Sequence, residues 1–318
     1  MSELMDRLRT VVVTTVTHFD VDGSVNHQRG ESHAAYLVDQ GIDALTPCGN
    51  TGEFWSLSMA EAKENISSVA RGAAKRATVI AGVGGSVPDA VDLAKHAERA
   101  GADAIMIHEP VHTYVHPAGV MTYYRRIIDA VGVGVVLYKR GPRLTNEIIA
   151  ELADIDQVVA VKYAVNDLNS FANLVSRVGS RIVWICGTAE RWAPFYHLAG
   201  AGGFTSGLAN FAPRLALQLL QSLRANDPTS SMALRREMTP FEQIRDGWNG
   251  GNNIPAVKEA MEVLGWGPGV VREPLCPLQA EDRRSVDSVV AEWIERGLVA
   301  PANSNVAVAE LHPVDQQQ

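Results

Sequence analysis

The chain has 318 residues, of which 46% are hydrophobic and 20% are charged, as is typical of a globular protein with a large core. Its 28 basic and 36 acidic residues give a net charge of −8, and the absence of a basic run argues against nucleic acid or an anionic membrane as a partner. No signal peptide, no apolar segment of membrane-spanning length and no CxxC pair is apparent. We therefore expect a cytoplasmic protein with reduced thiols.

One pattern repeats through the first two thirds of the chain: a short apolar run, a polar or glycine-containing loop, and a longer stretch with helical spacing. Eight such units, complete by about residue 224, fit an α/β fold of the (β/α)8 TIM-barrel type better than a doubly wound open sheet. The predicted strands are 11–16, 42–47, 77–82, 103–108, 133–138, 158–162, 181–186 and 202–206.

The remainder of the chain contains no strong strand pattern. Three helices are predicted near 231–245, 254–264 and 280–296. We therefore expect a barrel over 1–224, a C-terminal helical extension over 225–297 packed on it, and a loose tail over 298–318.

In barrels of this type the chemistry lies where the strands end, and Lys162 ends the sixth run. A buried amine loses its charge readily and can then attack a carbonyl, although a lysine at a strand end can also extend to water. Tyr138 ends the fifth run, so both side chains could enter the same mouth. A phenol there could relay protons, or lie at the rim with a solvated hydroxyl.

The segment CGNTGE at 48–53 joins the second run to a helix. Its glycines allow a tight turn whose N–H groups, together with a hydroxyl, could surround a carboxylate or a small phosphate. The simpler interpretation is an ordinary strand-to-helix turn. The turn alone does not decide between them.

Together these features resemble the dihydrodipicolinate synthase/N-acetylneuraminate lyase family of class I Schiff-base enzymes, over roughly residues 8–296. The resemblance is carried by GNTGE at 49–53, by Tyr138 and Lys162, by GGFTSGLANFAP at 202–213, and by the late segment IPAVKEAMEVLG. Any one of these motifs is weak, but their order on the predicted strands is specific.

The resemblance implies a role for each matching residue, and no cofactor. Lys162 would form the Schiff base with a 2-oxo acid, and Tyr138 would relay protons, with Thr51 linking it to solvent. The backbone N–H groups of Asn50 and Thr51 would hold the carboxylate of the 2-oxo acid. Thr205 would place its carbonyl near the imine.

Departures from the family pattern bear on the substrate. Asn50 stands where the synthase has a threonine, and Val111 and His112 stand where it has a tyrosine pair, although Tyr114 could substitute. These departures argue against the synthase reaction. Arg143, by contrast, matches the synthase's carboxylate-binding arginine and favours that reaction.

The segment from GTAE at 187–190 onward is closer to the family's sugar-acid dehydratases, particularly 5-dehydro-4-deoxyglucarate dehydratase. We therefore expect a 2-oxo-3-deoxy sugar acid, with dehydration ahead of aldol cleavage and the synthase reaction as the alternative. Arg140 and Arg143 are candidates for a distal carboxylate, because guanidinium pairs with carboxylate in a bidentate way. Gly187 and Ser206, which end the last two runs, complete the predicted substrate-binding set.

Three other functions have weaker support in the sequence. His108 to His112 spells HExxH, but zinc binding needs a helix there, which Pro110 opposes, so no metal is expected. GVGGS at 82–86 lacks the third glycine of a dinucleotide-binding turn. A non-catalytic 2-oxo acid binding protein remains a remote alternative. The resemblance also implies a homo-oligomer, either a dimer or a tetramer.

Overall fold

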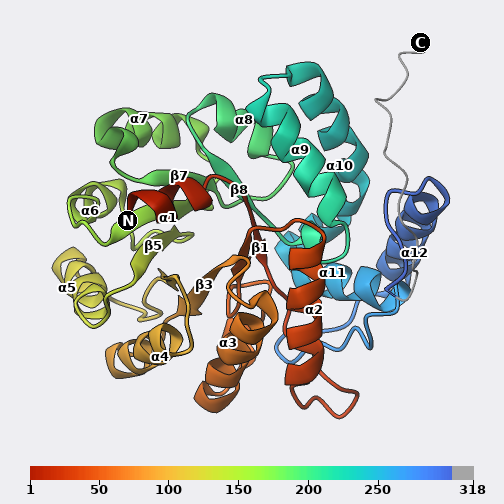
Figure 1. The fold of residues 1–318 in the computed structure, drawn as a ribbon, viewed down its shortest axis with the longest axis horizontal. Coiled ribbons are helices and arrows are strands. Elements are labelled where there is room, and N and C mark those ends of the chain that lie inside the picture. Colours follow the sequence, from red (N-terminus) through yellow and green to blue (C-terminus); the bar gives the residue numbers. More distant parts are fainter. Residues whose placement is uncertain (303–318) are drawn as a thin grey trace.

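Eight parallel strands close into one barrel in sequence order, from β1 through β8 and back to β1 (Figure 1). The computed structural model describes residues 1–302, and all eight predicted strands lie within two residues or so of their expected positions. The predicted (β/α)8 fold is therefore confirmed. The strands are β1 Val11–Thr14, β2 Ala44–Thr46, β3 Thr78–Val83, β4 Ala104–Ile107, β5 Gly134–Lys139, β6 Val158–Tyr163, β7 Val183–Cys186 and β8 Gly203–Ser206.

Helices follow the strands and surround the barrel (Figure 1). Their first turns carry capping side chains: Ser58 forms a capping box with Glu61, and Ser86 accepts from the N–H of Asp89. The surrounding helices are α2 His27–Asp39, α3 Met59–Ala73, α4 Val87–Arg99, α5 Pro117–Ile128, α6 Asn146–Leu152, α7 Leu168–Val178, α8 Ala193–Leu198 and α9 Pro213–Arg224.

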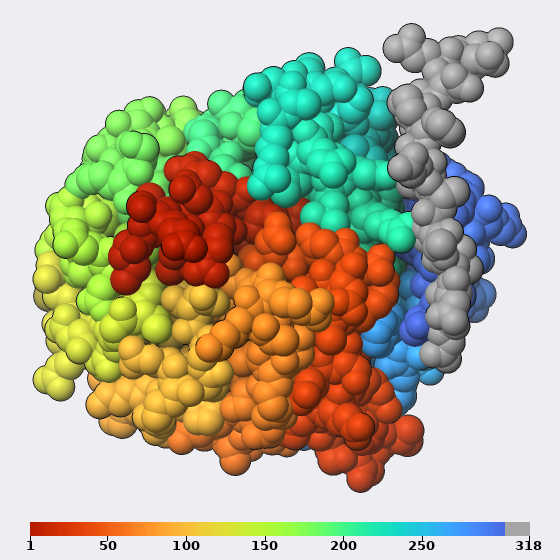
Figure 2. All heavy atoms as spheres, viewed as in Figure 1, coloured from red at the N-terminus to blue at the C-terminus, as the bar shows by residue number. Residues whose placement is uncertain are grey.

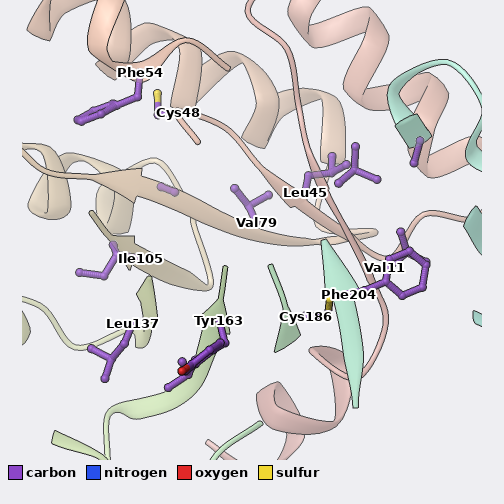
Figure 3. Packing of buried hydrophobic residues seen from close by; sticks show 14 of the residues in the cluster. Val11, Leu45, Cys48, Phe54, Val79, Ile105, Leu137, Tyr163, Cys186 and Phe204 are labelled. Atoms are coloured by element: carbon purple, nitrogen blue, oxygen red, sulfur yellow. The ribbon is translucent and has the colours of Figure 1, made fainter. Parts of the chain in front are cut away.

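The strands separate two apolar layers because successive side chains point to opposite faces. The outer layer packs between strands and helices and includes Ile105, Leu137 and Tyr163 (Figure 3). The inner layer fills the barrel and includes Val136 and Tyr138. This alternation decides which strand residues can reach the mouth of the barrel.

The N-terminal helix α1 Ser2–Arg7 closes one end of the barrel. Its Leu4, with Leu8 just beyond it, belongs to the inner layer. Figure 2 shows the N-terminal atoms spread over the middle of this face. The opposite end, where the strands finish, is the one left to form a site.

Beyond the barrel lie α10 Pro228–Gly250, α11 Asn253–Val263 and α12 Ala280–Glu295, close to the three helices predicted (Figure 1). Non-helical backbone at 247–249 separates the end of α10 from its body. The expected tail falls mostly on 303–318, outside the described residues. Across residues 1–302, no helix has both the length and the apolar content needed to span a bilayer.

Candidate active site

Lys162 and Tyr138 lie side by side at the mouth of the barrel. They are paired in the register between β5 and β6, and the Lys162 amine lies 4.4 Å from the centre of the Tyr138 ring. Both side chains are buried, with 5% and 4% exposure. The structure therefore brings together the two residues on which the sequence argument depended.

The Lys162 amine is both desolvated and unpaired. Within residues 1–302 its nitrogen makes no hydrogen bond or ion pair with the protein. Burial, with a smaller contribution from the positive charge of Arg140, lowers the pKa of Lys162 to about 7. A large fraction of this amine is consequently neutral and nucleophilic near neutral pH.

The Tyr138 hydroxyl accepts a hydrogen bond from Asn50 Nδ2 at 3.0 Å. Burial raises the pKa of Tyr138, so the phenol keeps its proton, while the nearby charge of Arg140 opposes this rise. The Thr51 side chain makes no hydrogen bond to another described residue. Asn50 therefore holds the phenol in this structure, and the relay role of Thr51 stays a prediction.

The 49–53 turn presents donors to the same mouth. Within the described chain, the backbone N–H groups of Asn50 and Thr51 donate to no protein acceptor. A β-carbon at Gly49 would lie 2.4 Å from Thr14 Cγ2, and one at Gly52 would lie 2.8 Å from the carbonyl oxygen of Thr15. Both glycines are needed for this packing, which leaves two N–H groups free for an anion.

The HExxH segment follows β4 as a loop and not as a helix. His108 stacks on Phe54 with ring centres 4.5 Å apart, and its Nε2 is hydrogen-bonded to the carbonyl of Cys48 at 2.9 Å. Burial lowers the pKa of His108 to about 4, so this ring is neutral. His108 thus packs behind the 49–53 turn.

Arg140 and Arg143 both lie in the turn after β5, and both line the mouth. The Glu109 carboxylate fixes this turn by accepting hydrogen bonds from the backbone of Arg140, Gly141, Arg143 and Leu144. Arg143 Nη2 donates to the carbonyl of His112 at 2.5 Å. This role of Glu109 was not apparent from the sequence.

The predicted residues at the ends of β7 and β8 lie on the side of Lys162 away from Tyr138. A β-carbon at Gly187 would approach Ala164 Cβ to 2.7 Å, so only glycine fits there. Thr205 Oγ1 donates to the Cys186 carbonyl at 3.4 Å. The Ser206 hydroxyl accepts from Ala209 N–H at 2.7 Å and contacts the Glu190 carboxyl.

Glu190 belongs to a buried charged group that sequence reasoning missed. Arg245 pairs with Glu242 at 2.6 Å, and all three side chains are buried. Burial and the adjacent Glu242 raise the pKa of Glu190 to about 8, against an opposing effect of Arg245. Glu190 is therefore protonated at neutral pH. Its place in GTAE was visible in the sequence, but its partners on α10 were not.

The predicted site residues line one cavity of about 690 Å³. Its wall includes all of them, namely Lys162, Tyr138, Asn50, Thr51, Thr205, Ser206, Gly187, Arg140 and Arg143. Residues from the C-terminal helices, including Arg245 and Asn253, complete it. Over residues 1–302, no group of three or more His, Cys, Asp or Glu side chains is arranged to hold a metal ion.

Comparison with known proteins agrees with this geometry. The chain matches the Dihydrodipicolinate synthetase family over residues 7–293. It is 32% identical over 283 residues to a probable 5-dehydro-4-deoxyglucarate dehydratase of Xanthobacter autotrophicus, covering 87% of this chain and 93% of that protein. A probable dehydratase of the same name from Saccharopolyspora erythraea is 33% identical over 285 residues, covering 87% and 91%. A crystal structure of dihydrodipicolinate synthase from Bacillus clausii has a TM-score of 0.88 and 41% identity, covering 92% and 99%. The chain therefore belongs to the dihydrodipicolinate synthetase family and is a class I, Schiff-base-forming lyase.

Proposed function

We propose that this enzyme dehydrates a 2-oxo-3-deoxy sugar acid, such as 5-dehydro-4-deoxyglucarate, through a Schiff base on Lys162. The observation that carries the proposal is the buried, unpaired Lys162 amine beside Tyr138, in the same cavity as the two free N–H groups of the 49–53 turn. A 2-oxo acid offers a carboxylate for the turn and an adjacent carbonyl for the amine.

The proposed reaction passes through an imine and an enamine on Lys162. The Lys162 amine attacks the carbonyl carbon, and loss of water leaves a protonated imine. This imine withdraws electrons, so a proton leaves the neighbouring carbon and the resulting enamine forms. The enamine then expels the hydroxyl one carbon further on, which leaves as water after gaining a proton. Tyr138, held by Asn50, is placed to relay the first proton.

The Ser206–Glu190 pair is suited to supply the second proton. The Ser206 hydroxyl donates to the Glu190 carboxyl and accepts from the Ala209 N–H. When the hydroxyl proton of Ser206 passes to the leaving group, the protonated Glu190 can replace it, so the pair can act as one proton donor. A group that donates favours loss of a hydroxyl as water, whereas aldol cleavage needs a group that accepts the hydroxyl proton.

The synthase reaction, condensation of pyruvate with an aldehyde, is the second candidate. The 41% identity to the Bacillus clausii structure and the position of Arg143 at the mouth support it. Against it stand Asn50, Val111 and His112, which replace residues of the synthase pattern. Assembly as a dimer or tetramer also remains a proposal, to be checked by light scattering.

The test is to trap intermediates while measuring products. After reduction with borohydride, Lys162 should carry a covalent adduct with the mass expected for pyruvate or for 5-dehydro-4-deoxyglucarate. Lys162→Ala should abolish both the adduct and turnover. Release of water without an aldol fragment supports the dehydratase. Turnover only with pyruvate plus an aldehyde would instead establish the synthase. Ligand binding without any adduct would refute both and indicate a binding protein.

A further inference from the structure

Four arginines line the cavity, and they differ in how many of their nitrogens the protein already occupies. All three guanidinium nitrogens of Arg245 are occupied, by Glu242 at 2.6 Å and by the carbonyl and the side chain of Asn253 at 3.2 Å each. Arg143 donates to the carbonyl of His112. Arg140 directly follows β5, two residues after Tyr138, and its charge acts on both Tyr138 and Lys162, so it lies at the near end of the cavity.

Arg191, just after the GTAE segment, retains donors that no described residue accepts. Its Nη1 pairs with Asp246, whose side chain is 66% exposed. Its Nε is buried without a partner, and its Nη2 makes no hydrogen bond within residues 1–302. Nε and Nη2 form the edge that grips a carboxylate with two parallel hydrogen bonds. An unoccupied fork of this kind is costly unless a ligand satisfies it.

The backbone holds this side chain in place. Ala189 has φ of +63°, a conformation that non-glycine residues rarely adopt, so the chain bends sharply between β7 and α8. The bend buries Glu190 completely and leaves Arg191 at the cavity wall. The carbonyl of Arg191 accepts from Arg235 Nε at 2.8 Å, which ties the segment to α10.

Strand order sets the direction of a bound substrate. Its first carboxylate would lie at the turn after β2, and its next carbon would be joined to Lys162 on β6. Because β2 and β6 lie across the barrel from each other, the rest of the substrate extends toward the segments after β5 and β7, the two strands that adjoin β6; of these, the segment after β7 carries the arginine whose Nε and Nη2 are unoccupied. Arg191 belongs to that segment.

We propose that Arg191 binds a second carboxylate at the far end of the substrate, and so selects a 2-oxo diacid over the corresponding monoacid. This inference rests on the proposed function and adds the residue that sets its specificity. It assigns the distal carboxylate to Arg191, where the sequence had suggested Arg140 or Arg143.

The test compares 5-dehydro-4-deoxyglucarate with the analogue that carries a primary alcohol in place of the far carboxylate. Removing a charge-assisted pair should lower kcat/KM for the diacid by about 10- to 100-fold in Arg191→Gln. The alcohol analogue should change by less than about threefold. Arg191→Lys should fall between, since an ammonium lacks the planar fork.

Matched variants separate binding from a structural role. Arg140→Gln and Arg143→Gln should affect both acids alike. Asp246→Asn removes the exposed partner of Arg191 and should keep the preference for the diacid. An equal effect of Arg191→Gln on both acids, or a selective loss of the diacid in Arg143→Gln instead, would overturn the assignment.

Failure of the proposed function gives a different result. A wild-type enzyme that traps pyruvate on Lys162 but prefers the alcohol analogue refutes the role of Arg191 and leaves the Schiff-base chemistry standing. A wild-type enzyme that converts neither acid refutes the proposed substrate, and the assignment of Arg191 with it.

Discussion

The reactivity of Lys162 should follow pH as expected for an amine with a pKa near 7. An ordinary lysine, with a pKa of 10.5, is neutral in roughly one molecule in 3,000 at pH 7, whereas a pKa of about 7 leaves half of the amines neutral. Burial therefore increases the nucleophilic fraction roughly a thousandfold. The rate of pyruvate trapping should rise about tenfold per pH unit below 7 and level off above it.

The assay is the initial rate of adduct formation with pyruvate and cyanoborohydride, followed by mass spectrometry between pH 5.5 and 9.5. Arg140→Gln should move the midpoint upward, because the positive charge of Arg140 is the second cause of the lowered pKa. Arg125→Gln removes the same charge from an exposed position on α5 and should leave the midpoint unchanged. A rate that keeps climbing tenfold per unit up to pH 9.5 would show that the amine is ordinary, and the reasoning would be wrong.

Three further predictions follow from buried charges. Lys162→Met should unfold at a higher temperature than the wild type. The margin should be full below pH 7, where the folded wild type buries a charged amine, should shrink as the pH rises from 7, and should disappear above pH 10.5. Ser206→Ala should lower kcat for water loss by about 100-fold with pyruvate trapping retained, and in the wild type this kcat should fall above pH 8 as Glu190 ionises. Lys258→Met should lower the free energy of unfolding, measured by urea denaturation, by about 3–5 kcal/mol, because it leaves the buried Glu53 carboxylate without its charged partner. Adding Glu53→Gln to this variant should restore most of the lost stability.

The strands could be predicted because a parallel barrel buries both faces of each strand and so produces continuous apolar runs. The meeting of Lys162 with Tyr138 could be predicted because both end such runs on neighbouring strands. What remained open was which face each side chain occupies. A shift of one residue would have pointed Lys162 into the outer layer, where Tyr163 lies.

The charged pairs could not be predicted, because each joins segments far apart in the chain. Glu53 pairs with Lys258 on α11, and Glu190 lies beside Glu242 and Arg245 on α10. In the sequence these are isolated charges on helices and turns, which are usually solvated. Only the packing of the C-terminal helices on the barrel brings them together and buries them.

These pairs explain how a chain with a net charge of −8 can attract an anionic substrate. Four carboxylates at the cavity are already occupied: Glu53 by Lys258, Glu242 by Arg245, Asp246 by Arg191, and Glu109 by the backbone of the turn after β5. The remaining donors are the free N–H groups of the 49–53 turn and the guanidinium groups of Arg140, Arg143 and Arg191. Because a pocket with low-dielectric walls strengthens local charges, this arrangement outweighs the overall negative field at short range. Weak dependence of KM on salt would agree with such short-range recognition, whereas a steep dependence would point to long-range attraction.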